Sequence, residues 1–358
     1  MIKIIIDGRP IRSPVAGVAT YVLGLVNALC QFEDFEITIA YDPDRACSLS
    51  LDRLPNSIKF FPIASGGFTR LAGEFGWSFD VEKYDLVFET YFARLPMRAS
   101  KRLAMIHDVI PLDNPRWFSL KEVLISYYAF YRQTLYCDVV VSPSDFTAKR
   151  INIFNPFVKK RSISVIPIGV EYNQSMTDMA PDRDTNKSSN QYIVGIGTVE
   201  PRKNYEMVCE AVRRINAGRA QQSRISFLVL GGFKKTEEKY IRELREAYPE
   251  TIFLGFVSEQ EKWAYLKDAQ CFISSSQYEG FGIPIIEAIR YDIPVLVRNN
   301  SSQKELVGSL NCFGGVSDLH VKLLDLLSRP EKYLVKKSAR YEWENVGKAY
   351  RRLILEIL

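Results

Sequence analysis

The residues best suited to chemistry are concentrated between positions 274 and 288, a segment with two glutamates, two glycines and a proline. Glu279 falls in a predicted loop, and Glu287 falls about one turn inside a predicted helix that Pro284 is well placed to begin. The glycines allow the backbone to come close to a ligand, and the unpaired N–H groups of the first helical turn can bind a phosphate. Ionised carboxylates accept hydrogen bonds, so two of them without a metal partner nearby are suited to bind pairs of sugar hydroxyls.

Each of these acids has a simpler interpretation when it is taken alone. Glu287 could complement the dipole of its helix, and Glu279 could be solvated. The combination of both acids with the glycines and Pro284 favours a ligand site over those two separate explanations.

Two cations and a histidine form the next set of candidates. Arg202 and Lys203 lie in a turn after a predicted strand and follow Pro201, so both side chains could project into the expected cleft. A solvated basic turn is the alternative. His107 ends an apolar run, which on its own is typical of a structural histidine, and its place at the end of a strand facing the expected cleft favours a functional role. His320 has no such setting and is interpreted as structural.

Composition excludes several classes of protein. The chain has 358 residues with 47% hydrophobic and 25% charged side chains, which is ordinary for a globular protein of two domains. Its six cysteines are scattered without a CxxC pair, and with only two histidines a zinc site or a disulfide framework is not expected; this usage suits a reducing cytoplasm. The net charge of +5 is too small to imply nucleic acid. No apolar run approaches the length of a membrane span, and the first residues resemble a strand rather than a signal peptide.

Short β-branched runs alternate with longer stretches of helical period, which is the pattern of parallel sheets built from βα units. The predicted strands are Ile2–Ile6, Glu36–Ala40, Ile58–Phe61, Leu86–Phe88, Arg102–Ile106, Val139–Val141, Ile163–Val165, Tyr192–Gly195, Ile225–Leu230, Thr251–Leu254, Cys271–Ser274 and Val295–Arg298. The predicted helices are Val18–Gln31, Leu120–Tyr136, Tyr205–Ala217, Lys239–Ala247, Glu259–Asp268, Pro284–Tyr291 and a last one within 340–358.

A polar stretch interrupts this alternation and divides the chain. We expect a first domain at 1–170, a linker at 171–190 and a second domain at 191–339, with the helix at 340–358 free to pack on either domain, including back on the first. Ligands of doubly wound sheets bind at the carboxyl ends of the strands. The fold class expected is therefore α/β, with two Rossmann-like domains facing a cleft.

The string from Glu279 to Glu287 resembles the E-x7-E signature of retaining glycosyltransferases with the GT-B fold, especially glycosyltransferase family 4 (glycosyl transferases group 1). The resemblance extends over most of the chain. Its other segments are Gly17–Tyr21, Ile106–Asp108, Val165–Val170, Gly197–Asn204 and Phe253–Val257.

The resemblance implies a role for each acid and for the start of the helix that follows. Glu287 would bind the ribose hydroxyls of a nucleotide sugar, and Glu279 would bind the hydroxyls of the donor sugar. Backbone N–H groups of Phe281, Gly282 and Ile283 would help to hold the sugar and the phosphate.

The resemblance also implies roles for residues elsewhere. Lys203 would neutralise the diphosphate and His107 would reach the reacting sugar. Many relatives carry an arginine where this chain has Thr198, so Arg202 would supply that cation from a shifted position. Gly17 would let its loop approach the diphosphate or the acceptor, unless it simply begins a helix. Base contacts are expected near Phe256 and Val257.

The predicted function is retaining transfer of a hexose, with mannose as the first guess, from a nucleotide-diphosphate sugar such as GDP-mannose to a glycan or lipid-linked glycan. A front-face mechanism without metal or cofactor is expected, in bacterial surface polysaccharide or lipopolysaccharide synthesis. The aromatic stretch Trp117–Arg132, with Lys121 and Arg132 nearby, could line an acceptor groove or touch a membrane, or could be an ordinary core-packed helix. The enzyme would be cytoplasmic, with possible contact to the inner membrane face.

Four rival functions share parts of this pattern. A dinucleotide-binding oxidoreductase is improbable because Glu200 stands at the third glycine position of the fingerprint and would repel a pyrophosphate. A GT-B epimerase or a phosphorylase would share the fold, and the phosphorylase would need a lysine-bound pyridoxal cofactor. A non-catalytic nucleotide-sugar-binding subunit would be favoured if the acidic or the basic pair were missing.

Overall fold

The computed structural model describes residues 1–11, 17–44, 54–63, 83–92, 94–156, 163–171, 191–233 and 235–358. The chain divides into two compact units, one of Met1–Glu171 with Ser338–Leu358 and one of Tyr172–Lys337. Apart from its first residue, the predicted linker at 171–190 lies outside the described residues.

A parallel sheet forms the centre of the first unit. Its strands are β1 (Ile2–Asp7), β2 (Phe35–Tyr41), β3 (Lys59–Pro62), β4 (Tyr84–Glu89), β5 (Ala99–Met105), β6 (Val139–Ser142) and β7 (Ile163–Val165). Among the described residues their order is β3-β2-β1-β4-β5-β6-β7, with every pair parallel. The order reverses between β1 and β4, which makes that point the topological switch of the sheet. Helices cover both faces, so β1 and β4 are apolar runs buried on both sides.

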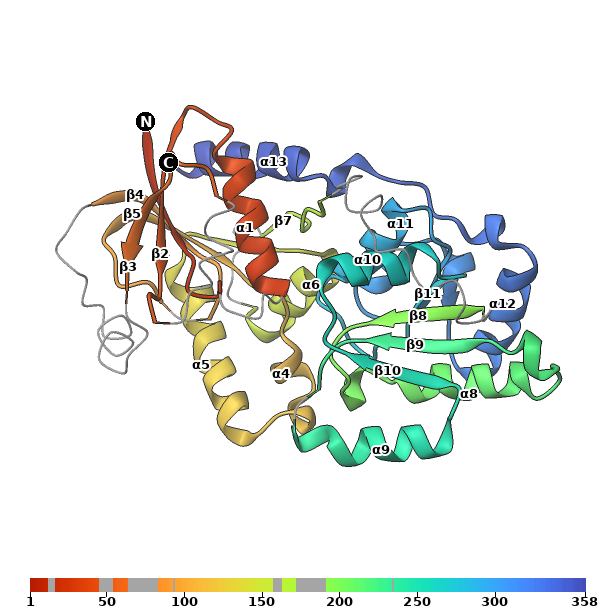
Figure 1. Cartoon of the computed structure of the whole chain (residues 1–358). Helices are drawn as coiled ribbons and strands as arrows, with labels where there is room; N and C mark the ends of the chain where they lie inside the picture. Colours follow the sequence, from red (N-terminus) through yellow and green to blue (C-terminus); the bar gives the residue numbers. More distant parts are fainter. Residues whose placement is uncertain are drawn as a thin grey trace. The chain divides into compact units, whose positions relative to one another are not determined.

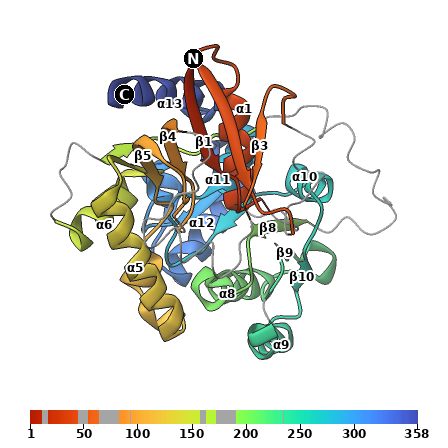
Figure 2. The same cartoon turned by 90° about the vertical axis from the view of Figure 1, so that its left-hand side faces the viewer.

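The helices of the first unit lie on two faces of that sheet (Figures 1 and 2). They are α1 (Gly17–Leu29), α4 (Ile110–Asp113), α5 (Leu120–Tyr136), α6 (Asp145–Phe154) and α13 (Trp343–Ile357). The N-terminus of α5 is fixed by a capping box between Ser119 and Glu122, and that of α6 by the hydroxyl of Ser144. The buried face of α5 packs with α4, β6 and α6 in one apolar cluster.

The last helix, α13, packs against α1 of this unit although most of the chain separates them in sequence. The indole of Trp343 lies directly over Gly24 of α1 and also over Gly169, where a side chain would leave no room for it. The hydroxyl groups of Tyr21 and Tyr350 are 2.7 Å apart and hydrogen-bond inside the same contact. The first unit is therefore built from both ends of the described chain.

The second unit repeats the architecture. Its strands are β8 (Tyr192–Ile196), β9 (Ser226–Leu230), β10 (Thr251–Gly255), β11 (Phe272–Ser274), β12 (Val295–Arg298) and β13 (Cys312–Phe313), in the order β10-β9-β8-β11-β12-β13 within the described part of the chain. Its helices are α8 (Tyr205–Asn216), α9 (Glu238–Ala247), α10 (Glu259–Lys267), α11 (Ile283–Arg290) and α12 (Val316–Ser328). Figure 1 shows α10 and α11 on one face of the sheet and α8 and α9 on the other. The switch of this sheet lies between β8 and β11.

The observed elements confirm the α/β fold class, and every predicted strand and helix is present within three residues at each end. The structure adds α4, α6, α12 and β13, which were not predicted. No helix among the described residues is long and apolar enough to cross a membrane.

Candidate functional site

The loops that follow β8 and β11 meet at the switch point of the second sheet, and they carry six of the predicted site residues: Thr198, Arg202, Lys203, Glu279, Phe281 and Gly282. The hydroxyl of Ser275 donates to the carbonyl of Lys203 at 2.8 Å, and the N–H of Gln277 donates to the carbonyl of Arg202 at 2.8 Å. These bonds hold the two loops in one register, so each loop positions the side chains of the other.

The turn after β8 depends on glycine at two places. Gly197 has a φ of 137° and Gly231, after β9, a φ of 156°. A Cβ at Gly231 would lie 2.1 Å from the carbonyl oxygen of Gly197, so the two backbone segments can approach only without a side chain. The hydroxyl of Tyr205 donates to the same carbonyl at 3.1 Å. Thr198, the residue at the family's arginine position, is exposed just beyond this contact.

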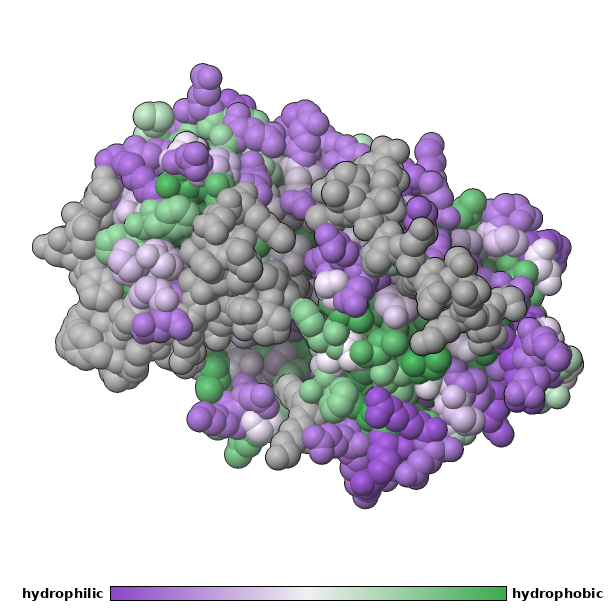
Figure 3. All heavy atoms as spheres, in the orientation of Figure 1, coloured by the Kyte–Doolittle hydropathy of each residue, from purple (hydrophilic) through white to green (hydrophobic). Residues whose placement is uncertain are grey.

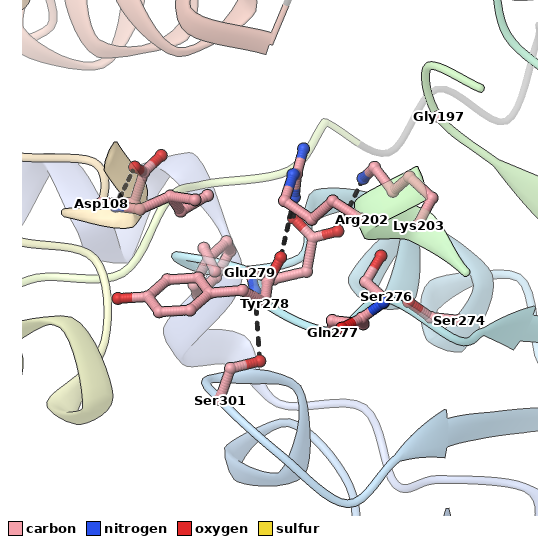
Figure 4. Close-up of polar contacts among 12 residues, drawn as sticks. Asp108, Gly197, Arg202, Lys203, Ser274, Ser276, Gln277, Tyr278, Glu279 and Ser301 are labelled. Atoms are coloured by element: carbon pink, nitrogen blue, oxygen red, sulfur yellow. Dashed lines mark hydrogen bonds and ion pairs between the residues drawn. The ribbon is translucent and has the colours of Figure 1, made fainter. Parts of the chain in front are cut away.

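Glu279 is the centre of a compact ionic cluster (Figure 4). Its Oε1 lies 2.6 Å from Nζ of Lys203, and its Oε2 lies 3.6 Å from a guanidinium nitrogen of Arg202. Burial opposes the ionisation of Glu279, but the two cations outweigh burial, so the pKa of Glu279 is lowered. Arg202 also donates to the carbonyl of Tyr278 at 2.7 Å and forms an ion pair with Glu200. The fold thus brings Glu279, Lys203 and Arg202, which the sequence offers as separate candidates, into contact.

A support for this loop, not predicted from the sequence, comes from the segment after β12. The hydroxyl of Ser301 accepts from the N–H of Glu279 at 3.2 Å (Figure 4). The hydroxyl of Ser302 contacts the carbonyls of Glu279 and Phe281, each at 2.8 Å, and both serines are buried. The burial of these serines and their backbone partners arise only in the fold, so the sequence offered no signal for them. These hydrogen bonds fix the position of the backbone at Glu279 and Phe281.

The start of α11 depends on a glycine at its N-cap. Gly282 is the N-cap with a φ of 116°, and a Cβ there would meet the side chain of Ile285 at 2.9 Å. Phe281 is buried, and Ile283 is the first helical residue, followed by Pro284 as predicted. In the first turn Pro284 has no N–H, and the N–H of Ile285 donates to the carbonyl of Gly282 at 3.0 Å, so the N–H groups suited to an anion are those nearest the end of the helix.

Glu287 lies in a separate ionic cluster. Its Oε1 is 2.8 Å from Nζ of Lys262 on α10, and the same ammonium lies 2.8 Å from Glu259 and over the ring of Trp263. Burial raises the pKa of Glu287, and Lys262 acts in the opposite direction. Burial lowers the pKa of Lys262, but Glu287 and Glu259 outweigh it, so that the pKa of the ammonium is raised. Lys262 was not predicted as a site residue, because a lysine among glutamates on a helix is typical of a solvated surface.

Phe256 and Val257 follow Gly255 at the end of β10, on a strip of exposed apolar surface. Phe256 is 68% exposed and Ile252 is also exposed, while Val257 is partly buried. Figure 3 shows this apolar surface next to the strongly polar helix α9. An exposed aromatic ring at the carboxyl edge of a sheet can stack with a flat, weakly polar ligand group.

The remaining predicted residues belong to the first unit. His107 follows β5, and its Nε2 lies 3.1 Å from the carbonyl oxygen of Thr90 after β4. Burial lowers the pKa of His107 to about 4. Gly17 is the exposed first residue of α1, with no atom within 4 Å of a Cβ built there, so sterics in the described residues do not require glycine.

No group of His, Cys, Asp and Glu side chains among the described residues is arranged to hold a metal ion. The chemistry present in the second unit is instead a carboxylate with two adjacent cations, a second buried carboxylate with its own cation, and a helix N-terminus. This combination is suited to a ligand that carries both hydroxyl groups and a diphosphate.

Comparison with solved structures defines the fold class. A sucrose-phosphate synthase from Thermosynechococcus elongatus matches with a TM-score of 0.72 at 16% identity, over 99% of this chain and all of that one. Anabaena HepE, solved in complex with UDP and glucose, matches with a TM-score of 0.71 at 16% identity and similar coverage. The fold is that of the GT-B glycosyltransferases.

Comparison with sequences supports the same class of enzyme. Residues 180–334 match the family model for glycosyl transferases group 1. The O-antigen chain mannosyltransferase B of Escherichia coli is 23% identical over 340 residues, which covers 88% of this chain and 87% of that protein. The chain is therefore a glycosyltransferase, and most of its second unit matches the group 1 family model.

Proposed function

We propose that the chain transfers a hexose from a nucleotide-diphosphate sugar with retention of configuration at the anomeric carbon. The observation that carries this proposal is the contact between Glu279, Lys203 and Arg202 at the switch point of the second sheet. One carboxylate beside two cations provides acceptors for sugar hydroxyls next to donors for phosphate oxygens.

The donor would be held mainly by the second unit. Glu279 would bind hydroxyls of the transferred sugar, Glu287 would bind the ribose, and the N–H groups of Phe281, Gly282 and Ile283 would hold the sugar and the phosphate. Lys203 and Glu279 are paired with each other in the ligand-free protein. On binding, a phosphate oxygen would take the place of Glu279 at Lys203, and sugar hydroxyls would take the place of Lys203 at Glu279. One buried ion pair would thus be replaced by two charged hydrogen-bonded contacts to the ligand.

Lys203 is the better candidate for the diphosphate, because its partner Glu279 gains sugar hydroxyls in exchange. Arg202 stays paired with Glu200 and bonded to the carbonyl of Tyr278, so we assign it to positioning the Glu279 loop as much as to binding phosphate. This cluster has no net charge, because the two cations are balanced by the carboxylates of Glu200 and Glu279. The N-terminus of α11 would therefore supply part of the field that the leaving diphosphate needs.

Mannose is the first candidate for the sugar and GDP-mannose for the donor, because the E. coli relative is named a mannosyltransferase. UDP-glucose is the second candidate, since HepE of the same fold was solved with UDP and glucose. The base would lie near Phe256 and Val257. The pathway we propose is cytoplasmic synthesis of a bacterial surface polysaccharide or lipopolysaccharide.

The mechanism we propose is front-face attack, in which the leaving phosphate accepts the proton of the acceptor hydroxyl. No metal or other cofactor takes part in it. Transfer should therefore survive EDTA, and mass spectrometry of the enzyme during turnover should show no glycosyl adduct. Activity that is lost on chelation and restored by manganese would contradict the metal-independent mechanism, and a trapped adduct on any side chain would contradict front-face attack.

A thermal-shift screen of nucleotide sugars tests the donor site directly, because a ligand that binds the folded state raises its melting temperature. The cognate donor should raise the melting temperature of the wild type and not that of Glu279→Gln. In turnover, Glu279→Gln and Lys203→Met should each lose roughly 2–4 kcal/mol of transition-state stabilisation. Glu243→Gln, an exposed glutamate on α9, is the matched control. Near-normal rates in both site variants would refute the site.

The same reaction mixtures separate the alternatives. A nucleotide-sugar epimerase would convert the donor without an added acceptor. A non-catalytic binding subunit would show the thermal shift and release no nucleotide when acceptors are offered.

For the acceptor we propose a glycan presented at a lipid surface, and the surface of α5 supports this. The solvent-facing side chains of α5 are almost all apolar or aromatic: Leu120, Leu124, Ile125, Tyr128, Tyr131, Leu135 and Tyr136. Lys121 is the cation on this arc, whereas Arg132 is buried against Glu89 and does not reach it. Of the acids on the described helix, Glu122 is bound in the capping box. An apolar arc with tyrosines, one cation and no available acid is suited to the interface of a bilayer.

Vesicle co-sedimentation tests this surface. The protein should pellet with phosphatidylcholine–phosphatidylglycerol vesicles, and Leu124→Ser/Leu135→Ser should stay in the supernatant. The control Val321→Ser/Leu324→Ser removes two exposed apolar side chains from α12 and should pellet like the wild type. No pelleting of the wild type, or a dimer in light scattering that only the α5 variant abolishes, would overturn the proposal in favour of another occupant of this face.

A further inference from the structure

Glu200 places a negative charge beside the proposed diphosphate site of the second unit. It lies directly before the short turn Pro201–Lys203 after β8, and its carbonyl accepts from the N–H of Lys203 at 2.9 Å. Its carboxylate forms an ion pair with Arg202. A carboxylate repels an anion, so Glu200 must weaken the binding of any phosphate at Lys203.

The four charged side chains of this cluster balance one another. Arg202 and Lys203 carry two positive charges, and Glu200 and Glu279 carry two negative charges, so the cluster is neutral in the ligand-free protein. These side chains are only 15–27% exposed, so solvent screens their charges less than it screens charges on the open surface. Neutralising Glu200 would leave one net positive charge without adding or removing a cation.

Glu200 is held in place by the contacts of its neighbours. The N–H of Val199, a fully buried residue, donates to the carbonyl of Gly232 at 2.9 Å. Arg202, the partner of the carboxylate, is itself bound to the carbonyl of Tyr278 at 2.7 Å (Figure 4). The charge of Glu200 is therefore a fixed part of the site and does not belong to a freely moving surface group.

The charge of the ligand changes during the proposed reaction. Each phosphate of a nucleotide-diphosphate sugar carries one negative charge, which makes two in total. Transfer breaks the bond between the anomeric carbon and the phosphate oxygen, and the bonding electrons remain on that oxygen. The acceptor oxygen forms the new bond and loses its proton. Because the second pKa of a terminal phosphate is about 6, this proton passes to solvent at neutral pH and above, and the product carries about three negative charges.

We propose that Glu200 weakens the binding of the nucleoside diphosphate product more than that of the donor, and thereby promotes product release. The inference rests on the proposed function, which assigns the diphosphate to Lys203. The product has one more negative charge than the donor, so a fixed carboxylate repels the product more strongly. A unit charge about 10 Å away in partly buried surroundings changes affinity by roughly three- to tenfold for each charge on the ligand.

The same repulsion slows the chemical step. Bond breaking builds negative charge on the leaving diphosphate, and Glu200 opposes this charge as it opposes product binding. An enzyme whose turnover is limited by product release still becomes faster, because release raises kcat although bond breaking is slower. In Glu200→Gln we therefore expect a single turnover at least as fast as in the wild type, together with stronger inhibition by the nucleoside diphosphate.

Calorimetric titration of Glu200→Gln tests the charge effect, because glutamine keeps an oxygen acceptor for Arg202 and removes the charge. The probes are inorganic pyrophosphate, GDP and GDP-mannose, with UDP and UDP-glucose in place of the last two if the thermal-shift screen selects that donor. Pyrophosphate and GDP should bind at least roughly tenfold more tightly than to the wild type, and the ratio of the GDP and GDP-mannose affinities should shift roughly three- to tenfold toward GDP. Glu200→Asp, which keeps the charge, and Glu243→Gln, which removes an exposed charge on α9, should leave this ratio within about twofold.

The outcomes separate charge from structural support. Because the ratio compares two ligands on one protein, a partly unfolded variant does not change it. The double variant Glu200→Gln/Arg202→Met is neutral again and should return the ratio to the wild-type value. An unchanged ratio in Glu200→Gln, weaker binding of all three ligands, or no binding of pyrophosphate to either protein would overturn the proposal. Absence of sugar transfer by the wild type would refute the proposed function alone, because the pyrophosphate and GDP titrations would still decide the role of the charge.

Discussion

Replacing Lys262 by methionine should destabilise the second unit in a way that depends on pH. The lysine neutralises Glu287, whose side chain is 10% exposed, and also contacts Glu259, which is largely exposed. Methionine keeps most of the aliphatic volume and removes the charge. The variant therefore isolates the electrostatic part of the contact.

The magnitude follows from the two partners. Breaking a buried ion pair by removing one member costs about 3–5 kcal/mol, because the other charge remains buried. The contact with Glu259 adds only about 0.3–0.5 kcal/mol, as is typical of a helical surface pair. Since Glu287 can take up a proton instead of staying charged, we expect the lower end, about 3 kcal/mol at pH 8. A unit of this size would then melt roughly 6–12 °C lower.

The sign of the pH dependence follows from the direction of the shift. Burial already raises the pKa of Glu287 above its ordinary value of 4.5, and removal of Lys262 raises it further. A carboxyl with a raised pKa in the folded state is destabilising when ionised, so stability is lost as pH rises above 4.5 and is regained as pH falls. At pH 5.5 the residual loss should be about 1 kcal/mol, mostly the lost contact with Trp263.

Calorimetry at pH 5.5 and pH 8 measures this, with the double variant Lys262→Met/Glu287→Gln as the control. The double variant should recover most of the loss at pH 8 and show little dependence on pH, because no unpaired buried charge remains. An equal loss at both pH values, or a double variant no more stable than Lys262→Met, would show that the pair contributes packing rather than charge.

Two substitutions of glycine test the backbone contacts. Gly231→Ala places a Cβ 2.1 Å from the carbonyl oxygen of Gly197, so it should lower the free energy of unfolding by more than about 2 kcal/mol and abolish the thermal shift with donor. Gly218→Ala, which has open space around its Cβ, is the control. Equal melting temperatures of the two variants would refute the contact. Gly24→Ala places a Cβ within 2.2 Å of the indole of Trp343, so calorimetry should show a loss of about 1–3 kcal/mol in the first unit, and an unchanged transition would mean that the last helix does not need this contact.

Strands could be predicted from the sequence because both sheets are parallel and covered on both faces. Such strands are short apolar runs between polar turns, as at Ile2–Ile6 and Val139–Val141, and the observed strands differ from the predicted ones only at their ends. The helix α12 was not predicted although Leu319, Leu323 and Leu326 recur at helical spacing, so its signal was present in the sequence.

The contacts within the site could not be predicted, because they join residues that are far apart in the sequence. Glu279, Lys203 and Arg202 were identified as separate motifs, and their contact arises only because β8 and β11 are neighbours in the sheet. The hydroxyls of Ser301 and Ser302 bind backbone atoms, whose positions have no sequence signature. The partner of Glu287 proved to be a lysine 25 residues away.

The return of α13 to the first unit has a consequence for how the chain is made. Residues 338–358 complete a unit whose other elements lie before residue 172, so the ribosome must synthesise the whole second unit before the first can close. At about 5–20 residues per second this interval lasts on the order of 10–30 seconds. During that time the groove over Gly24 and Gly169 that accepts Trp343 is open on the nascent chain. The order of translation thus gives the second unit time to fold first, and the first unit can complete its folding only after α13 has been synthesised.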